Sequence, residues 1–150
     1  MEIVRAVAAD LDALAALCGA LWPASTIEGL RRRIPEVAGP QARDLALIAR
    51  DGGTAVGFAE IALRNDDVNG CDSSPVAFPE GIYVAPGDRH QGVVRALIDA
   101  GIDWAGRHGV TEFASDAPLE NHASHAFHRA VGFAETERIA YFRPVRQGVA

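Results

Sequence analysis

The stretch GIYVAPGDRHQGVVRAL, residues 81–97, decides the fold. Its apolar first part is typical of a strand, and residues from about Arg89 to Arg107 have the apolar spacing of a helix. The turn between them carries Arg89 and Gly92, and Arg95 follows in the helix. Because the first N–H groups of a helix have no partner within it, and the helix dipole is positive there, this junction predicts a site for phosphate or pyrophosphate.

This turn differs from two common phosphate-binding motifs. No Gly-Lys-Ser/Thr follows Gly92, so the turn is not a Walker loop, and the G-x-G-x-x-G fingerprint of dinucleotide-binding folds is absent. Gly92 has no side chain, so a ligand can approach the backbone closely at this point.

The composition indicates one acidic, globular domain over residues 1–150, since 49% of the residues are hydrophobic. A net charge of −6 argues against nucleic acid as a partner and suits a cationic substrate. No apolar run reaches the roughly 20 residues that span a bilayer, and the first residues are acidic where a signal peptide is basic. We therefore expect a cytoplasmic protein with no membrane partner. Cys18 and Cys71 are expected to be free thiols.

Periodicity outward from the central stretch predicts ten elements. The expected strands cover residues 2–7, 44–50, 54–64, 78–86, 111–116 and 133–145, and the expected helices cover residues 11–22, 25–34, 89–107 and 121–131. The order βααβββαβαβ predicts an α+β fold in which a central mixed sheet has helices on both faces.

Turn and cap residues set the expected boundaries. Asp10 is expected to cap the first helix, and Ser25 and Glu28 have the spacing of a capping box at the second. Pro35 and Pro40 bracket an expected loop.

Two polar segments are expected to connect strands. Asp-Gly-Gly, residues 51–53, is a hairpin signal, and residues 65–75 form a polar loop that is too rich in turn formers to be a strand.

At this point the chain resembles the GNAT acetyltransferases. Residues 89–94, RHQGVV, resemble the family's pyrophosphate loop [Q/R]-x-x-G-x-[G/A], with Val94 in place of the usual small residue. Residues 121–133, NHASHAFHRAVGF, resemble the family segment N-x-x-[AS]-x-x-[FL]-[YH]-x-x-x-G-F, and the strand order also matches. The resemblance covers essentially the whole chain and implies the GNAT fold and acetyl-CoA as cofactor.

A closer resemblance is to the small, dimeric aminoglycoside 6'-N-acetyltransferases of Gram-negative bacteria. It rests on residues 68–86, on ASD at 114–116, on GFAETER at 132–138 and on LWP at 21–23. It implies acetylation of the 6'-amino group of an aminoglycoside, resistance to these antibiotics, and a homodimer.

Acetyl transfer to an amine needs a base, an oxyanion donor and an acid for the leaving thiolate. Asp116 is the favoured base, directly or through water, with Glu80 close behind, because both lie on strands beside the expected cleft. The resemblance implies that the N–H of Val84 is the oxyanion donor. It also places His128 where many relatives carry the tyrosine that protonates the leaving thiolate. Tyr141 is a second candidate for this acid.

The resemblance implies a larger set of binding residues. Those expected to bind acetyl-CoA are Ile82, Tyr83, Val84, Arg89, His90, Gln91, Gly92, Val93, Val94, Arg95, Asn121, Ser124 and His128. Those expected to bind the cationic substrate are Trp22, Asp66, Asp67, Asp72, Glu80, Asp116 and Glu137. His122, His125 and His128 recur at every third residue, but no carboxylate or cysteine in the same helix completes a site, so no metal is expected.

Other functions compete with this interpretation. A GNAT enzyme acting on a polyamine, an amino acid or a peptide N-terminus has the same motifs. A non-catalytic acyl-CoA-binding module is suggested by Val94. A toxin that acetylates aminoacyl-tRNA needs a basic surface, which the net charge of −6 argues against.

Overall fold

The computed structural model describes residues 1–38, 44–146 and 148. The chain divides into two compact units, Met1–Asp116 and Ala117–Ala150, and each is described here by itself. The elements of the first unit are β1 Glu2–Arg5, the 3-10 helix η1 Ala8–Asp10, α1 Leu11–Leu21, α2 Ile27–Ala38, β2 Leu45–Asp51, β3 Thr54–Arg64, β4 Val76–Val84, the 3-10 helix η2 Pro86–Asp88 and α3 Val93–Arg107. The second unit contains α4 His122–Ala130.

The four strands form one antiparallel sheet in the order β1-β2-β3-β4. β2 and β3 form the predicted hairpin: Asp51 pairs with Thr54 across Gly52 and Gly53, whose φ angles of 54° and 86° favour glycine. One parallel bridge joins Ala77 to Phe113 on the outer edge of β4. The sheet is therefore antiparallel, with a single parallel contact where a mixed sheet was expected.

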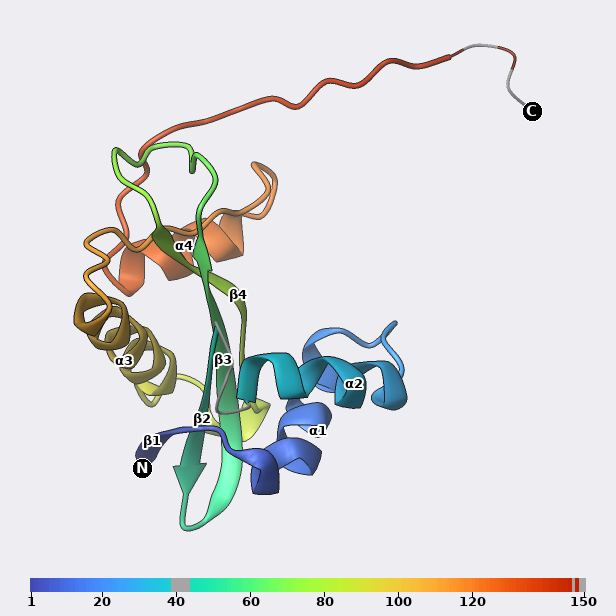
Figure 1. Ribbon diagram of the computed structural model, residues 1–150, viewed down its shortest axis with the longest axis vertical. Coiled ribbons are helices and arrows are strands. Elements are labelled where there is room, and N and C mark those ends of the chain that lie inside the picture. The colour runs from blue at the N-terminus through green and yellow to red at the C-terminus, as the bar shows by residue number, and fades with distance from the viewer. Residues whose placement is uncertain (39–43, 147, 149–150) are drawn as a thin grey trace. The chain divides into compact units, whose positions relative to one another are not determined.

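Helices cover both faces of the sheet, as predicted (Figure 1). Side chains alternate between the faces of a strand, so in β2 Leu45 and Leu47 pack with α3 while Ile48 packs with α1 and α2. Burial on both faces explains why β2 is almost continuously apolar. Phe58 of β3 has no exposed surface and lies in the α1–α2 layer.

The capping of the first two helices differs from the prediction. Asp10 is the N-cap residue of α1, as predicted, but its side chain makes no cap hydrogen bond: its carboxylate accepts the N–H of Val7 and pairs with Arg50 of β2. The hydroxyl of Thr26, not that of Ser25, accepts an N–H in the first turn of α2, from Gly29 at 3.0 Å.

Proline placement and the third helix also differ. α2 continues through Pro35 to Ala38, because a proline removes one hydrogen bond without always ending a helix. The expected loop at Pro40 lies outside the described residues. α3 begins at Val93, because Gly92 is its N-cap with φ 80° and Arg89 is extended.

Two predicted strands are wrong. Over residues 111–116 only the bridge at Phe113 forms, and over residues 133–145 no strand forms among the described residues. A strand exists only where its N–H and C=O groups have a neighbour, and an alternating sequence does not supply one. The observed order is βααβββαα, with 3-10 turns before α1 and α3.

The membrane prediction can be compared with the helices directly. Within the described ranges, none of the helices has both the length and the apolar composition needed to span a bilayer.

The two cysteines differ in reactivity, which gives a first prediction. Burial, with the negative charge of Glu60 adding to it, raises the pKa of Cys18 to about 12; partial burial also raises the pKa of Cys71. The thiolate is the reactive form, so a raised pKa lowers reactivity at a given pH. At about pH 8 we expect a disulfide reagent to modify the half-buried Cys71 slowly and the buried Cys18 only after unfolding. A Cys71→Ser protein that still reacts while folded would contradict this.

Candidate active site

The outer edge of β4 is the first component of the site. The N–H of Ala85 donates to Val56 of β3, at 2.8 Å, and alternate residues of a strand direct their backbone groups to opposite edges. The backbone groups of Ile82 and Val84 therefore face away from β3. Past Ala77, no described residue forms a ladder with this edge. An extended chain can add here as a further strand does.

The turn after β4 is the second component, and it has the geometry of an anion site. Gly92 precedes α3 in a left-handed conformation, and His90 also has a positive φ of 63°. Arg89 donates through Nε to the carbonyl of Val84 at 2.9 Å, and Gln91 donates to the carbonyl of Gly87 at 3.1 Å. These bonds hold the turn while the first N–H groups of α3, a 15-residue helix, face an incoming anion.

The unusual Val94 packs inward. It is half-buried and contacts the core cluster beneath α3, whereas its neighbour Val93 is 4% exposed. The larger side chain is therefore accommodated by the core of the first unit.

Arg64, at the end of β3, gathers three carboxylates. It forms two hydrogen bonds with Glu80 of β4, both of 2.9 Å, and its guanidinium lies 3.5 Å from the centre of the Phe78 ring. The hydrogen bond to Glu80 raises the pKa of Arg64, and the negative charges of Asp116 and Asp66 act in the same direction. Three carboxylates around one guanidinium cation leave a net negative charge, which suits a cationic substrate.

A cavity of about 360 Å³ lies next to this cluster. It is lined by Trp22, Ser25, Leu30, Arg33, Glu60 and Glu80. Gly81 makes room for Trp22, because a Cβ at Gly81 would lie 2.7 Å from the indole ring. Trp22 also meets Phe58 edge-on, with ring centres 6.0 Å apart. We call this cavity the acceptor pocket.

Glu60 is the buried charge of the acceptor pocket. Its side chain is 3% exposed, and Oε2 accepts from Arg33 of α2 at 2.8 Å. Its other oxygen, Oε1, is buried and has no hydrogen-bond partner within the described part of the chain. The Arg33 guanidinium also lies 5.1 Å from the centre of the Trp22 ring, so one cation contacts both the carboxylate and the aromatic face.

The polar loop at residues 65–75 is fixed to the segment that follows α3. Glu112 accepts the N–H groups of Asp72 and Ser73, and the hydroxyl of Ser73 lowers the pKa of that carboxyl. Asp72 therefore lies at the Glu112 end of the loop. Asp66 belongs to the Arg64 cluster, and Asp67 is exposed.

The second unit holds the remaining predicted residues. Asn121 caps α4 by accepting the N–H of Ser124 at 3.0 Å. Nδ1 of His128 donates to the carbonyl of Ser124 at 2.7 Å, and the ring packs edge-on against Phe127 and Phe133.

Two other predicted residues of this unit are exposed. Tyr141 is 83% exposed, and Glu137 is also at the surface. Among the described residues, no three histidine, cysteine, aspartate or glutamate side chains are grouped to hold a metal.

Sequence reasoning missed Glu60, Arg33 and Arg64. Glu60 carried a signal, because it is the sole charged residue in the apolar run AVGFAEIAL, residues 55–63. A lone carboxylate in such a run is rarely buried without a partner. The two arginines carried no comparable signal, since arginines at helix surfaces and strand ends are common.

Comparison with known proteins places this geometry in a family. The model of the acetyltransferase (GNAT) family matches residues 14–133. The chain belongs to the GNAT acetyltransferase family. The turn between β4 and α3, which the sequence predicted within residues 81–97, lies inside the matched range.

Two relatives of this GNAT chain are named aminoglycoside N(6')-acetyltransferase type 1. It is 48% identical over 136 residues to an aminoglycoside N(6')-acetyltransferase type 1 of Serratia marcescens, covering 92% of that protein and 89% of this chain. It is 42% identical to the protein of the same name from Salmonella typhimurium, covering 98% of that protein and 95% of this chain.

Two solved structures of AAC(6') proteins also resemble this chain. The structure of AAC(6')-Iy in complex with the bisubstrate analogue CoA-S-monomethyl-acetylneamine matches with a TM-score of 0.89 and 38% identity, over 97% of this chain and 98% of that one. The structure of AAC(6')-IG from Acinetobacter haemolyticus matches with a TM-score of 0.87 and 37% identity, over 98% of this chain and 100% of that one.

Proposed function

We propose that the chain transfers the acetyl group of acetyl-CoA to the 6'-amino group of aminoglycoside antibiotics and so confers resistance. The observation that carries the proposal is the meeting of carboxylates at the acceptor pocket: Glu60 lines it, and Glu80 joins it to the Arg64 cluster. Several carboxylates in one place suit a substrate with several ammonium groups. The names of the relatives support the same substrate.

The cofactor fits the anion turn and the edge of β4. The N–H groups at the start of α3 receive the pyrophosphate, with Arg95 and the turn residues from Arg89 to Val94 around it. Ile82 and Val84 pair with the pantetheine arm as an added strand does, and Tyr83 lies between them. Acetyl-CoA supplies the activated acetyl group, and in this proposal the N–H of Val84 stabilises negative charge on its carbonyl oxygen.

We assign different tasks to the two carboxylates. Glu80 is occupied by two hydrogen bonds from Arg64, so it is suited to orient the substrate. Asp116 is exposed and accepts no hydrogen bond among the described residues, so its oxygens are available to remove a proton from the amine, directly or through one water. Trp22, Asp66, Asp67, Asp72 and Glu137 complete the substrate contacts.

The acid that protonates the thiolate is assigned to His128. A carbonyl can only accept, so Nδ1 of His128 carries a hydrogen, and Nε2 is the nitrogen through which the ring passes a proton to the sulfur. Asn121 and Ser124 order the start of the same helix. Tyr141 remains the alternative acid.

The test is the release of the CoA thiol from acetyl-CoA. We expect turnover with an aminoglycoside bearing a 6'-amine and none above the background hydrolysis rate with the matched analogue bearing a 6'-hydroxyl. Equal turnover would place the reaction on another amine. Tight acetyl-CoA binding without turnover on either analogue, or on polyamines and peptides, would leave a cofactor-binding module and overturn the proposal.

We also propose a cytoplasmic homodimer in which the C-terminal segment contacts a second copy. Tyr141, Phe142 and Val145 are 83%, 95% and 83% exposed, and large apolar side chains in a row favour burial in an assembly. Light scattering should give twice the mass of one chain, and Phe142→Asp should shift it toward the monomer. A monomer in the parent protein, or a dimer indifferent to the substitution, would contradict this arrangement.

A further inference from the structure

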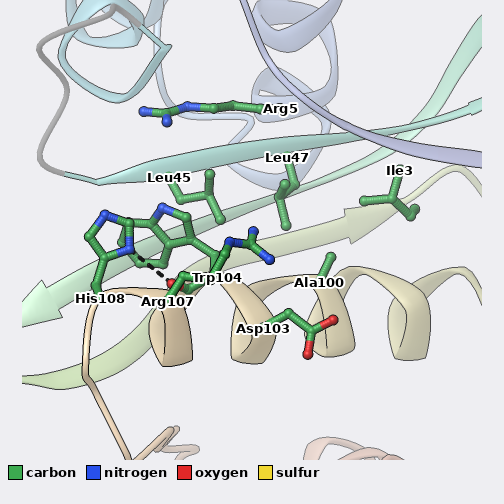
Figure 2. Close-up of a pocket in the computed structure, with 9 residues that line it drawn as sticks. All are labelled: Ile3, Arg5, Leu45, Leu47, Ala100, Asp103, Trp104, Arg107 and His108. Atoms are coloured by element: carbon green, nitrogen blue, oxygen red, sulfur yellow. Dashed lines mark hydrogen bonds between the residues drawn. The ribbon is translucent and has the colours of Figure 1, made fainter.

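A second cavity, of about 400 Å³, lies between α3 and the β1–β2 edge of the sheet (Figure 2). Its volume is within the range of small-molecule sites, roughly 300–1,000 Å³. It shares no lining residue with the acceptor pocket. It is formed by the C-terminal half of α3, whereas the anion turn is at the N-terminus of that helix.

One wall of this cavity is apolar. Leu45 and Leu47 of β2 are 2% and 5% exposed, and the half-buried Ile3 and Ala100 complete the wall from β1 and α3. This surface suits the hydrocarbon body of a ligand, because apolar contact there removes area from water on both sides.

The end of the cavity near Trp104 is charged. Arg5 and Arg107 both line the cavity, and Figure 2 shows Arg107 next to Trp104 and Arg5 across the β2 ribbon from it. One acidic residue, Asp103, also lines the cavity, so these three side chains have a net charge of +1. In a chain whose net charge is −6, two arginines at one cavity form a local site for an anion.

Trp104 supplies an unused donor at the same end. The residue is 6% exposed, and its indole Nε1 is buried with no hydrogen-bond partner among the residues that the structure describes. In Figure 2 the nitrogen edge of the indole faces Leu45. A buried N–H without an acceptor is costly, so a ligand oxygen that reaches it is favoured.

His108 holds the indole in this orientation. Its Nδ1 donates to the carbonyl of Trp104 at 2.9 Å, and its ring lies 4.7 Å from the indole, centre to centre. His108 and Arg5 are both exposed, so their side chains have room to move when a ligand enters.

We propose that this cavity binds a small amphipathic carboxylate, one with an apolar body and a single carboxylate group. The carboxylate lies between Arg5 and Arg107 and accepts the N–H of Trp104, and the body lies on the leucine wall. The site is separate from the proposed acetyl-transfer site, so either can fail without the other.

The test follows the indole N–H signals of the ¹⁵N-labelled full chain, whose two tryptophans, Trp22 and Trp104, lie in different cavities. The probe is 4-phenylbutyrate, and its neutral control is 4-phenylbutyramide. We expect the probe at millimolar concentration to move the Trp104 signal downfield and leave that of Trp22 in place. The amide should bind at least about tenfold more weakly.

Variants assign the contact. Arg5→Gln and Arg107→Gln should each weaken binding of the probe about tenfold, and the exposed Arg31→Gln, on α2, should not change it. An unmoved Trp104 signal would overturn the proposal. So would equal binding of acid and amide, a shift confined to Trp22, or binding that both arginine variants leave intact.

Discussion

The Asp116→Asn variant is expected to turn over an aminoglycoside about 10²- to 10³-fold more slowly than the parent enzyme, while the KM for acetyl-CoA changes little. Asparagine has nearly the same shape as aspartate and still accepts a hydrogen bond, but it cannot take up the proton of the attacking amine. The loss should therefore appear in kcat and not in the binding of either substrate.

Glu80→Gln is the matched comparison. Glu80 is bound to Arg64 through two hydrogen bonds, so its neutralisation releases that guanidinium into a pocket meant for cations. We expect a higher KM for the aminoglycoside and a smaller loss of kcat. Asp51→Asn, at the exposed end of the β2–β3 hairpin, controls for the removal of one negative charge.

Steady-state kinetics on all three variants decide the roles. If Asp116→Asn keeps its kcat within a few-fold, the base lies elsewhere. If Glu80→Gln instead loses kcat at unchanged KM, the two carboxylates exchange roles and the acetyl-transfer proposal stands.

The sequence predicts those parts of the fold whose residues specify it locally. The β2–β3 hairpin follows from two apolar runs and Asp-Gly-Gly, and the anion turn follows from Gly92 before an amphipathic helix. Residues 133–145 show the opposite case: their alternation favours an extended chain, but the pairing that defines a strand depends on a neighbour that no local pattern specifies.

The candidate site shows the same difference between local sequence signals and contacts made across the fold. Glu80, Asp116 and Asp66 all act on Arg64, the first through two hydrogen bonds and the other two through their negative charge. Arg64 and Arg33 were missed because their importance comes from what they contact across the fold. The Arg33–Glu60 pair joins residues 27 positions apart, and only the packing of α2 against the sheet brings them into contact.

Substitutions in the Arg33–Glu60 pair are expected to have the second large effect, this time on stability, and the effect differs between the two partners. Arg33→Met should lower the free energy of unfolding by about 3 kcal/mol, because it leaves the Glu60 carboxylate buried without its cation. Glu60→Gln should cost less, since the Arg33 side chain is already 38% exposed and can turn to water when its partner is neutral.

The double variant Arg33→Met, Glu60→Gln separates charge from packing. If the buried charge causes the loss, the second substitution restores most of the stability that Arg33→Met removes, as a double-mutant cycle in urea will measure. If the double variant is as unstable as the sum of the two single variants, the contribution of Arg33 is its contact with Trp22 and the helix, and Glu60 is already accommodated without it. Restored stability would mean that the Glu60 carboxylate is stable in the acceptor pocket only beside a positive charge. A site for a substrate ammonium group requires a carboxylate with this property.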